Sequence, residues 1–316
     1  MADPLYTIRR ALCVVLEDTE GTDQEPAVGD VVLCRTLNPP KLNQDTVERT
    51  LAGRGFFGGF KMLPTRANFT LEFEVEMAGF GTAGPAAPTP GYDALLRICA
   101  LSRTITADTK VDYAPVTTGI ESASLYFYQD GQLHKMLGAR GTMRCSFAKN
   151  AVPVYRFTIT GLYGGVSDAA FPTVDTSAYV QPAPCVPGQT TFSLHGIATL
   201  GLESFELDLG NTLVHRNLPN ITERVLITGR AATASLQIEH AKNSIYDFWA
   251  AVRAATDGAF SLTHGATAGN IVKLAIPNAN LKEPDFAEQD GLVHLSLGMD
   301  VKPTAAGNDE VLLTIQ

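Results

Sequence analysis

The stretch RANFTLEFEVEM, residues 66–77, decides how the chain folds. Its apolar side chains occupy every second position from Phe69 to Met77 and alternate with one threonine and three glutamates. Successive side chains of a strand point to opposite faces of a sheet, so this period of two predicts a strand with one buried and one solvated face. The solvated face would carry Glu72, Glu74 and Glu76.

A short helix is predicted after a proline- and glycine-rich insert at 79–91. Apolar residues recur at helical spacing from Tyr92 to Leu101, and Thr89 with Pro90 suits an N-cap and first turn. Further strands are predicted at 124–128, 133–136, 143–147 and 154–160, with a hairpin turn at 129–131 and a bend at 138–141.

The second half of the chain repeats this order. An alternating strand at 234–239 is followed by a helix predicted at 246–252, which begins with the same Tyr-Asp pair as residues 92–93. Ser244 and Asp247 resemble a capping box in which Asp replaces the usual Glu.

The later parts of the two halves match as well. A Gly-Ala stretch at 265–269 corresponds to the bend at 138–141, and strands are predicted at 271–276 and 293–297. The entry segments, 33–39 and 213–219, are also alike. The shared order predicts an internal duplication.

This duplication predicts a mainly β protein of two tandem domains, each with one short helix. The first domain would span 1–165 and include a long loop at 39–64. Residues 166–190 contain four prolines and are predicted to form a linker. The second domain would span 191–316 and open with a strand pair at 204–209 and 212–216.

Composition excludes several classes of protein. The 316 residues are 45% hydrophobic and 18% charged, which predicts a globular protein. The net charge is -9, and residues 161–316 hold 8 Lys and Arg against 16 Asp and Glu. No strongly basic surface is predicted, so tight binding to phosphates is not expected. An acidic surface could let DNA slide past, although mild acidity is also ordinary for soluble proteins.

Five scattered cysteines predict buried free thiols in a reducing cytoplasm, because they are odd in number and lack CxxC spacing. The apolar run at 11–16 is too short for a signal-peptide core or a membrane span. We therefore expect the chain to stay in the cytoplasm until lysis, with no membrane partner.

No pattern of catalytic, cofactor-binding or metal-binding residues stands out. The six histidines lack HExxH spacing, and no GxSxG or dinucleotide fingerprint is present. The three glutamates of 66–77 lie about 7 Å apart along an extended strand, too far to clasp one ion unaided. An exposed polar face, or a wall facing a channel, is favoured. No enzyme, cofactor or metal is predicted.

The segment GRGFFGGF, residues 53–60, superficially resembles a phosphate loop but lacks its order of residues. Phenylalanines in so glycine-rich a segment suggest docking against a neighbouring molecule. The alternative is that the segment folds back over its own domain. The contact candidates are Arg54, Phe56, Phe57 and Phe60.

Several runs together resemble the tail tube proteins of long-tailed, non-contractile phages. The likeness extends from about residue 30 to 300 and contains no catalytic signature. It rests on residues 125–131, 138–141, 155–163, 205–216, 227–230 and 269–270.

The resemblance implies a β-sandwich or half-barrel domain whose strands join those of neighbouring subunits around a lumen. Rings of six such domains would stack into a tube in the virion tail, around the tape-measure protein and later around DNA. Tail terminator and distal tail proteins would be further partners. Two domains per chain favour a trimeric, pseudo-hexameric ring, and a hexamer of whole chains stays open. Glu72, Glu74 and Glu76 are the candidates to face the lumen.

Two other functions remain as alternatives. A distal-tail or baseplate hub protein would use the same sheet architecture. A carbohydrate-binding β-sandwich is less favoured, because the single tryptophan, Trp249, lies in a predicted helix.

Overall fold

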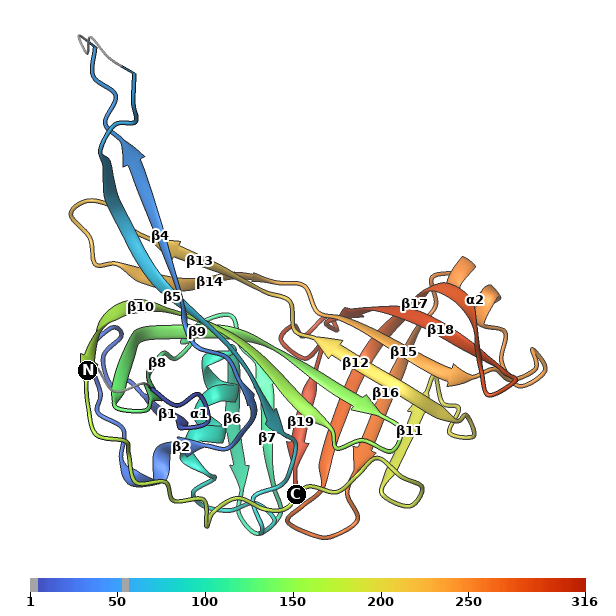
Figure 1. Cartoon of the computed structure of the whole chain (residues 1–316). Helices are drawn as coiled ribbons and strands as arrows, with labels where there is room; N and C mark the ends of the chain where they lie inside the picture. The colour runs from blue at the N-terminus through green and yellow to red at the C-terminus, as the bar shows by residue number, and fades with distance from the viewer. Residues whose placement is uncertain (1–4, 53–56) are drawn as a thin grey trace.

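The computed structural model describes residues 5–52 and 57–316. Strands dominate the fold, and the described chain has two α-helices. Figure 1 shows two β-rich bodies side by side, with two hairpins extending together from one end. The predicted mainly β fold class is confirmed.

The first body is built from residues 10–168. Its elements are β1 (Arg10–Leu16), the 3-10 turn η1 (Val28–Asp30), β2 (Val31–Val32), β3 (Cys34–Leu37), β4 (Lys41–Glu48), β5 (Met62–Glu76), α1 (Pro90–Ile98), β6 (Leu101–Thr106), β7 (Lys110–Pro115), β8 (Ala123–Gln129), β9 (Gln132–Ala148) and β10 (Val154–Asp168).

The second body follows an irregular segment at 169–189. Its elements are β11 (Thr190–Leu194), β12 (Leu202–Asp208), β13 (Asn211–Arg216), β14 (Arg224–Arg230), β15 (Thr233–Glu239), α2 (Phe248–Arg253), β16 (Asp257–His264), β17 (Val272–Gln289), β18 (Leu292–Lys302) and β19 (Leu312–Ile315).

One antiparallel sheet runs through both bodies in the order β3, β5, β10, β9, β12, β15, β18, β17. Within this sheet the bodies meet at the ladder between β9 and β12, which extends from Arg144 opposite Asp208 to Ala148 opposite Ser204. A second ladder, between β7 and β19, also joins them, with Val111 opposite Ile315 and Tyr113 opposite Leu313. The two bodies are therefore joined by backbone hydrogen bonds in addition to the connecting segment at 169–189.

The alternation of 66–77 sets the two faces of this sheet. Leu71, Phe73 and Val75 are buried, and the ring of Phe73 stacks on Phe157 of β10 at 5.4 Å between centroids. The intervening glutamates lie on the opposite, polar face. The predicted strand is thus confirmed, and β5 extends it to Met62.

Helix α1 covers the core of the first body with Leu95, Leu96 and Ile98, all fully buried. The chain enters it through Thr89 as N-cap and Pro90 in the first turn, as predicted. The Thr89 hydroxyl, however, donates to the carbonyl oxygen of Ala178 at 3.4 Å and does not cap the helix.

A buried carboxylate ties this helix to the sheet. Asp93 is 3% exposed and accepts hydrogen bonds from the Tyr113 hydroxyl at 2.6 Å, Arg103 at 2.6 Å and Arg97 at 3.2 Å. We expect Asp93→Ala to lower the free energy of unfolding by about 3 kcal/mol, because three donors lose their shared acceptor. Urea unfolding of the unassembled protein measures this. The exposed substitution Asp168→Ala is the control, and equal stability of the two variants would contradict the expectation.

The segment before β11 is held by a buried histidine. The His264 Nδ1 lies 2.8 Å from the Thr190 hydroxyl, and its Nε2 lies 3.0 Å from the carbonyl oxygen of Ala183. A neutral ring satisfies both contacts, with Nε2–H donating to the carbonyl and Nδ1 accepting from the hydroxyl. Burial accordingly lowers the pKa of His264.

This lowered pKa predicts acid sensitivity. As pH falls, the unfolded chain takes up a proton at His264 before the folded chain does, so the stabilising contribution is present at neutral pH and is lost below about pH 6.5. We expect His264→Gln to lose less unfolding free energy than the wild type between pH 7.5 and 5, measured by urea unfolding at each pH. Parallel losses would refute the assignment.

Three expectations about local structure were wrong. No bend occurs at 138–141, because β9 runs unbroken from Gln132 to Ala148. Gly138, with φ +56°, lies in a β-bulge of this strand. The N-cap of α2 is Asp247, whose side chain accepts from the backbone N–H of Ala250 at 2.9 Å; Ser244 does not cap it.

The third concerns the strands around Gly210. β12 pairs with β9 and β15, whereas β13 pairs with β14 in a separate sheet, so the two strands do not form a pair. Gly210 has φ +61°, and a Cβ there would lie 2.2 Å from the carbonyl oxygen of Ala231. The chain therefore turns out of the central sheet at this glycine.

Candidate assembly surfaces

A long hairpin, the β4–β5 arm (41–63), projects from the first body (Figure 1). Residues 39–64 were expected to be a loop; they contain β4 and the start of β5, paired from Lys41 opposite Thr70 to Glu48 opposite Met62. The arm is unusually apolar for an exposed element. Its exposed large hydrophobic residues are Leu42, Val47, Leu51, Phe57, Met62 and Leu63.

A second hairpin, the β13–β14 arm (211–230), lies against the base of the first. Arg66 donates to the carbonyl oxygen of His215 at 3.3 Å, and the Asn68 amide lies 2.9 Å from His215 Nδ1. His215 Nε2 in turn lies 2.6 Å from a carboxylate oxygen of Glu223. The two arms are thus fastened to each other near their bases.

The central sheet ends in two open edges. At one end, β3 pairs with β5, and the strand pairings of the described chain place nothing on its other side. At the other end, residues 281–289 of β17 pair only with β18 within residues 5–52 and 57–316. Backbone N–H and C=O groups along such edges can pair with another strand, and in β3 the carbonyl oxygen of Leu37 also accepts from Arg10 at 3.0 Å.

The polar face of the sheet carries a network of charges. Arg156 pairs with Glu74 at 2.9 Å, and Arg144 pairs with Asp208 at 2.8 Å. Glu206 lies 3.9 Å from Arg156 and 4.0 Å from Arg144. The network extends across β5, β10, β9 and β12, so this face is continuous between the two bodies.

The structure describes two of the four predicted contact residues. Phe57 is fully exposed near the tip of the β4–β5 arm, and Phe60 is half-buried. Arg54 and Phe56 lie outside the described residues. Of the three glutamates, Glu72 and Glu76 are exposed and Glu74 is half-buried beside Arg156.

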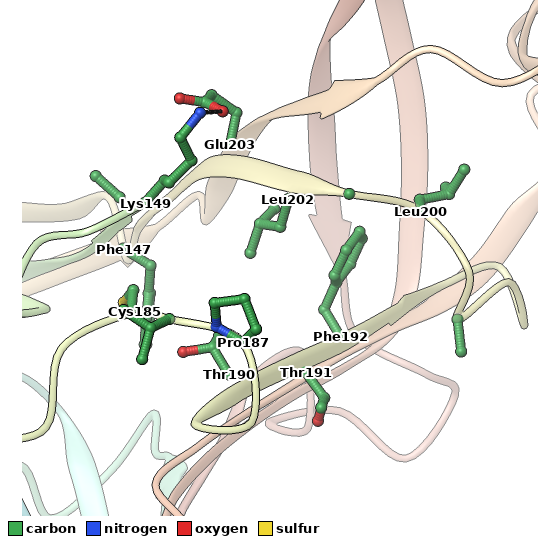
Figure 2. A pocket seen from close by; sticks show the side chains of 14 residues that line it. Phe147, Lys149, Cys185, Pro187, Thr190, Thr191, Phe192, Leu200, Leu202 and Glu203 are labelled. Atoms are coloured by element: carbon green, nitrogen blue, oxygen red, sulfur yellow. Dashed lines mark hydrogen bonds and ion pairs between the residues drawn. The ribbon is translucent and has the colours of Figure 1, made fainter.

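An apolar pocket of about 360 Å³ lies where the two bodies meet. Figure 2 shows that it is lined from the end of β9 and from the segment leading into β12, with Phe147, Pro187, Phe192 and Leu202 around it. Lys149 and Glu203 also line it, and their charged groups pair at 2.8 Å. This pair marks the end of the ladder that joins the bodies.

Neither a metal centre nor a membrane helix is among these surfaces. Over residues 5–52 and 57–316, no three His, Cys, Asp or Glu side chains are grouped to hold a metal ion. In the same part of the chain no helix has the length and apolar character needed to span a membrane.

The open edge of β17 was missed from the sequence, although a signal for it exists. Pro284 lies inside this strand, and prolines occur in sheets at edges and bulges because they lack an N–H donor. The register of β17 against β18 shifts between Lys282 and Asp285, and Glu283 has φ +52°. A proline within a charged strand run thus marked both the bulge and the edge.

Comparison with known proteins identifies a family. A search of curated proteins finds no match to this chain. A comparison with protein families matches residues 7–307 to the family described as phage tail tube protein. That match covers nearly the whole chain and confirms the resemblance seen in the sequence. The chain belongs to the phage tail tube protein family, a family of structural proteins that assemble into the tube of the virion tail.

Proposed function

We propose that this chain is the major tube subunit of a phage with a long, non-contractile tail. Copies would assemble into stacked rings around the tape-measure protein and later conduct DNA during ejection. The observation that carries this proposal is a continuous sheet with one polar face and two open edges, in a member of the tail tube family. A closed ring would satisfy both edges at once.

The proposed ring contains three chains, each contributing two domains at 1–165 and 191–316, joined by 166–190. A repeated detail of the central sheet supports it. The ladder of β3 on β5 skips one residue between Cys34 and Thr36, and the ladder of β12 on β15 skips one residue between Leu202 and Ser204. Each of these two strands, β3 and β12, is followed by a hairpin arm. Two equivalent modules per chain would give a pseudo-hexamer.

The polar face of the sheet is the proposed wall of the lumen. The buried face packs against α1 and the core, so it is not available to line a channel. The polar face presents Glu72 and Glu76 beside the Arg144 and Arg156 network. Alternating charges with exposed carboxylates would offer DNA little net attraction.

The remaining parts of the proposal follow from the role of a tube. Tail terminator and distal tail proteins would cap the two ends, and assembly would take place in the host cytoplasm before the tube is carried in the virion. The work is structural, without catalysis or a cofactor, and DNA would pass without recognition of its sequence.

Electron microscopy of the purified protein tests this function. We expect tubes of stacked rings, each with three chains arranged with pseudo-sixfold symmetry. Rings of six whole chains would refute the trimer. A stable monomer that never polymerises would refute the tube itself. Copy number separates the tube from a distal-tail or baseplate hub, which would occur as one or two rings per virion.

A further inference from the structure

We infer that the ring closes when β3 of one copy pairs with the end of β17 in the next copy, locked by an ion pair between Arg35 and Asp290 of the partner subunit. The inference rests on the proposed self-assembly and names the surface and residues that perform it. The ladder of β12 on β9, inside one chain, is its template.

The template begins with a five-residue ladder. β12 pairs with the last five residues of β9, from Arg144 to Ala148. Just beyond the end of β9, the backbone N–H of Lys149 donates to the carbonyl oxygen of Glu203 at 2.9 Å. The side chains of the same two residues form an ion pair at 2.8 Å (Figure 2).

The last five residues of β17 stand in the same position. They run from Asp285 to Gln289 and precede the β17–β18 turn, as Arg144–Ala148 precede the β9–β10 turn. Faces agree as well: Phe286 lies opposite the buried Leu295, just as Cys145 lies opposite the buried Tyr155. In this correspondence Gln289 matches Ala148.

Phe286 distinguishes the open edge from the closed one. It lies on the core side of the sheet, yet it is 61% exposed. Cys145, its counterpart in β9, is 1% exposed, with β12 paired alongside. A strand added next to residues 285–289 would remove apolar surface of Phe286 from water as well as pair the backbone.

β3 matches β12 in the same detail. Both strands carry one bulge residue, which is Arg35 in the first module and Glu203 in the second. Thr36 then corresponds to Ser204 and would lie opposite Gln289 of the partner subunit, as Ser204 lies opposite Ala148. The new ladder would be short, because Pro39 and Pro40 follow β3 and cannot donate a backbone hydrogen bond.

The charges at the two junctions are reversed but complementary. Within the chain, Lys149 after β9 meets Glu203 at the bulge. Between chains, Asp290 after β17 would meet Arg35 at the bulge, and both side chains are exposed in the single chain. Opposite charges at matched positions are expected of surfaces that select each other. This complementarity of charge is found only when β3 is aligned with β12 and β17 is aligned with β9.

Charge reversal tests the pairing. We expect Arg35→Glu and Asp290→Arg each to raise the protein concentration needed for half-assembly about tenfold, with the doubly reversed variant returning close to wild type. Asp168→Arg, an exposed substitution elsewhere, is the matched control. Urea unfolding of each unassembled variant checks that its fold is retained.

A second variant tests contact directly. Arg35→Cys combined with Asp290→Cys is expected to give covalent trimers on oxidation, whereas each single variant gives none. If wild-type rings form but reversal shows no rescue and the double cysteine variant shows no cross-link, the inferred pairing is wrong and the tube function stands. If the wild type forms no rings at all, both the proposed function and this inference are wrong.

Discussion

Deletion of residues 53–60 is expected to leave the fold of the subunit intact and to abolish tube growth, so that single rings accumulate. The described residues of this segment, 57–60, belong to the β4–β5 arm, which projects from the first body and exposes apolar side chains along its length. Loss of one aromatic anchor from an interface costs about 2 kcal/mol or more, so the loss of three phenylalanines should weaken ring stacking about ten-thousandfold. Electron microscopy and sedimentation measure ring and tube populations.

Matched variants separate the aromatic side chains from the length of the arm. Replacing 53–60 by eight glycine and serine residues keeps the length and should also block growth. Ile245→Ser removes an exposed apolar side chain outside both arms and should not. Tubes of normal length from the deletion variant would show that the arm does not connect successive rings.

Replacing two negative charges on the polar face by positive ones should convert a tube with little affinity for DNA into one that binds DNA. In the variant Glu72→Lys/Glu76→Lys, lysines replace exposed carboxylates beside Arg144 and Arg156. With about six phosphate contacts, affinity for DNA should fall roughly a thousandfold between 50 and 200 mM salt. We expect nuclease-resistant DNA inside the variant tubes at low salt, released as salt rises.

The control for this experiment is Glu72→Gln/Glu76→Gln, which removes the negative charges without adding positive ones. It should hold little DNA at either salt concentration. Glu74 is left unchanged in both variants, because its pairing with Arg156 at 2.9 Å contributes to the sheet itself. DNA that binds the lysine variant but stays sensitive to nuclease would place this face on the outside of the tube.

Local patterns predicted the elements whose energetics are local. The alternation at 66–77 identified β5 because one face of that strand is buried and the other is wet. Thr89 and Pro90 located the start of α1, since a helix start depends on a few neighbouring residues. The family, too, was recognisable, because its strands and turns are spread over most of the chain.

Features that depend on distant partners could not be predicted in this way. Glycines at 138 and 141 suggested a bend, yet β9 continues through them: Gly138 absorbs a bulge, and at Gly141 a Cβ would lie 2.2 Å from the side chain of Ile159. Residues 39–64 read as a loop because their strand pairing has no buried face to impose alternation. The union of both bodies depends on the pairing of β12 with β9 and of β19 with β7, and no local pattern predicts these partners.

The charges of the two bulge residues, Arg35 and Glu203, would also affect how often strands pair with the wrong partner during assembly. If β3 of a stray copy displaced β12 from β9, its arginine would meet Lys149; if β12 moved onto β17, its glutamate would meet Asp290. Either mispairing would place like charges side by side, whereas the β9–β12 ladder and the inferred β17–β3 ladder place opposite charges side by side. In the proposed ring of duplicated chains, this charge pattern would disfavour mispairing between copies and preserve the order of modules in a crowded infected cell.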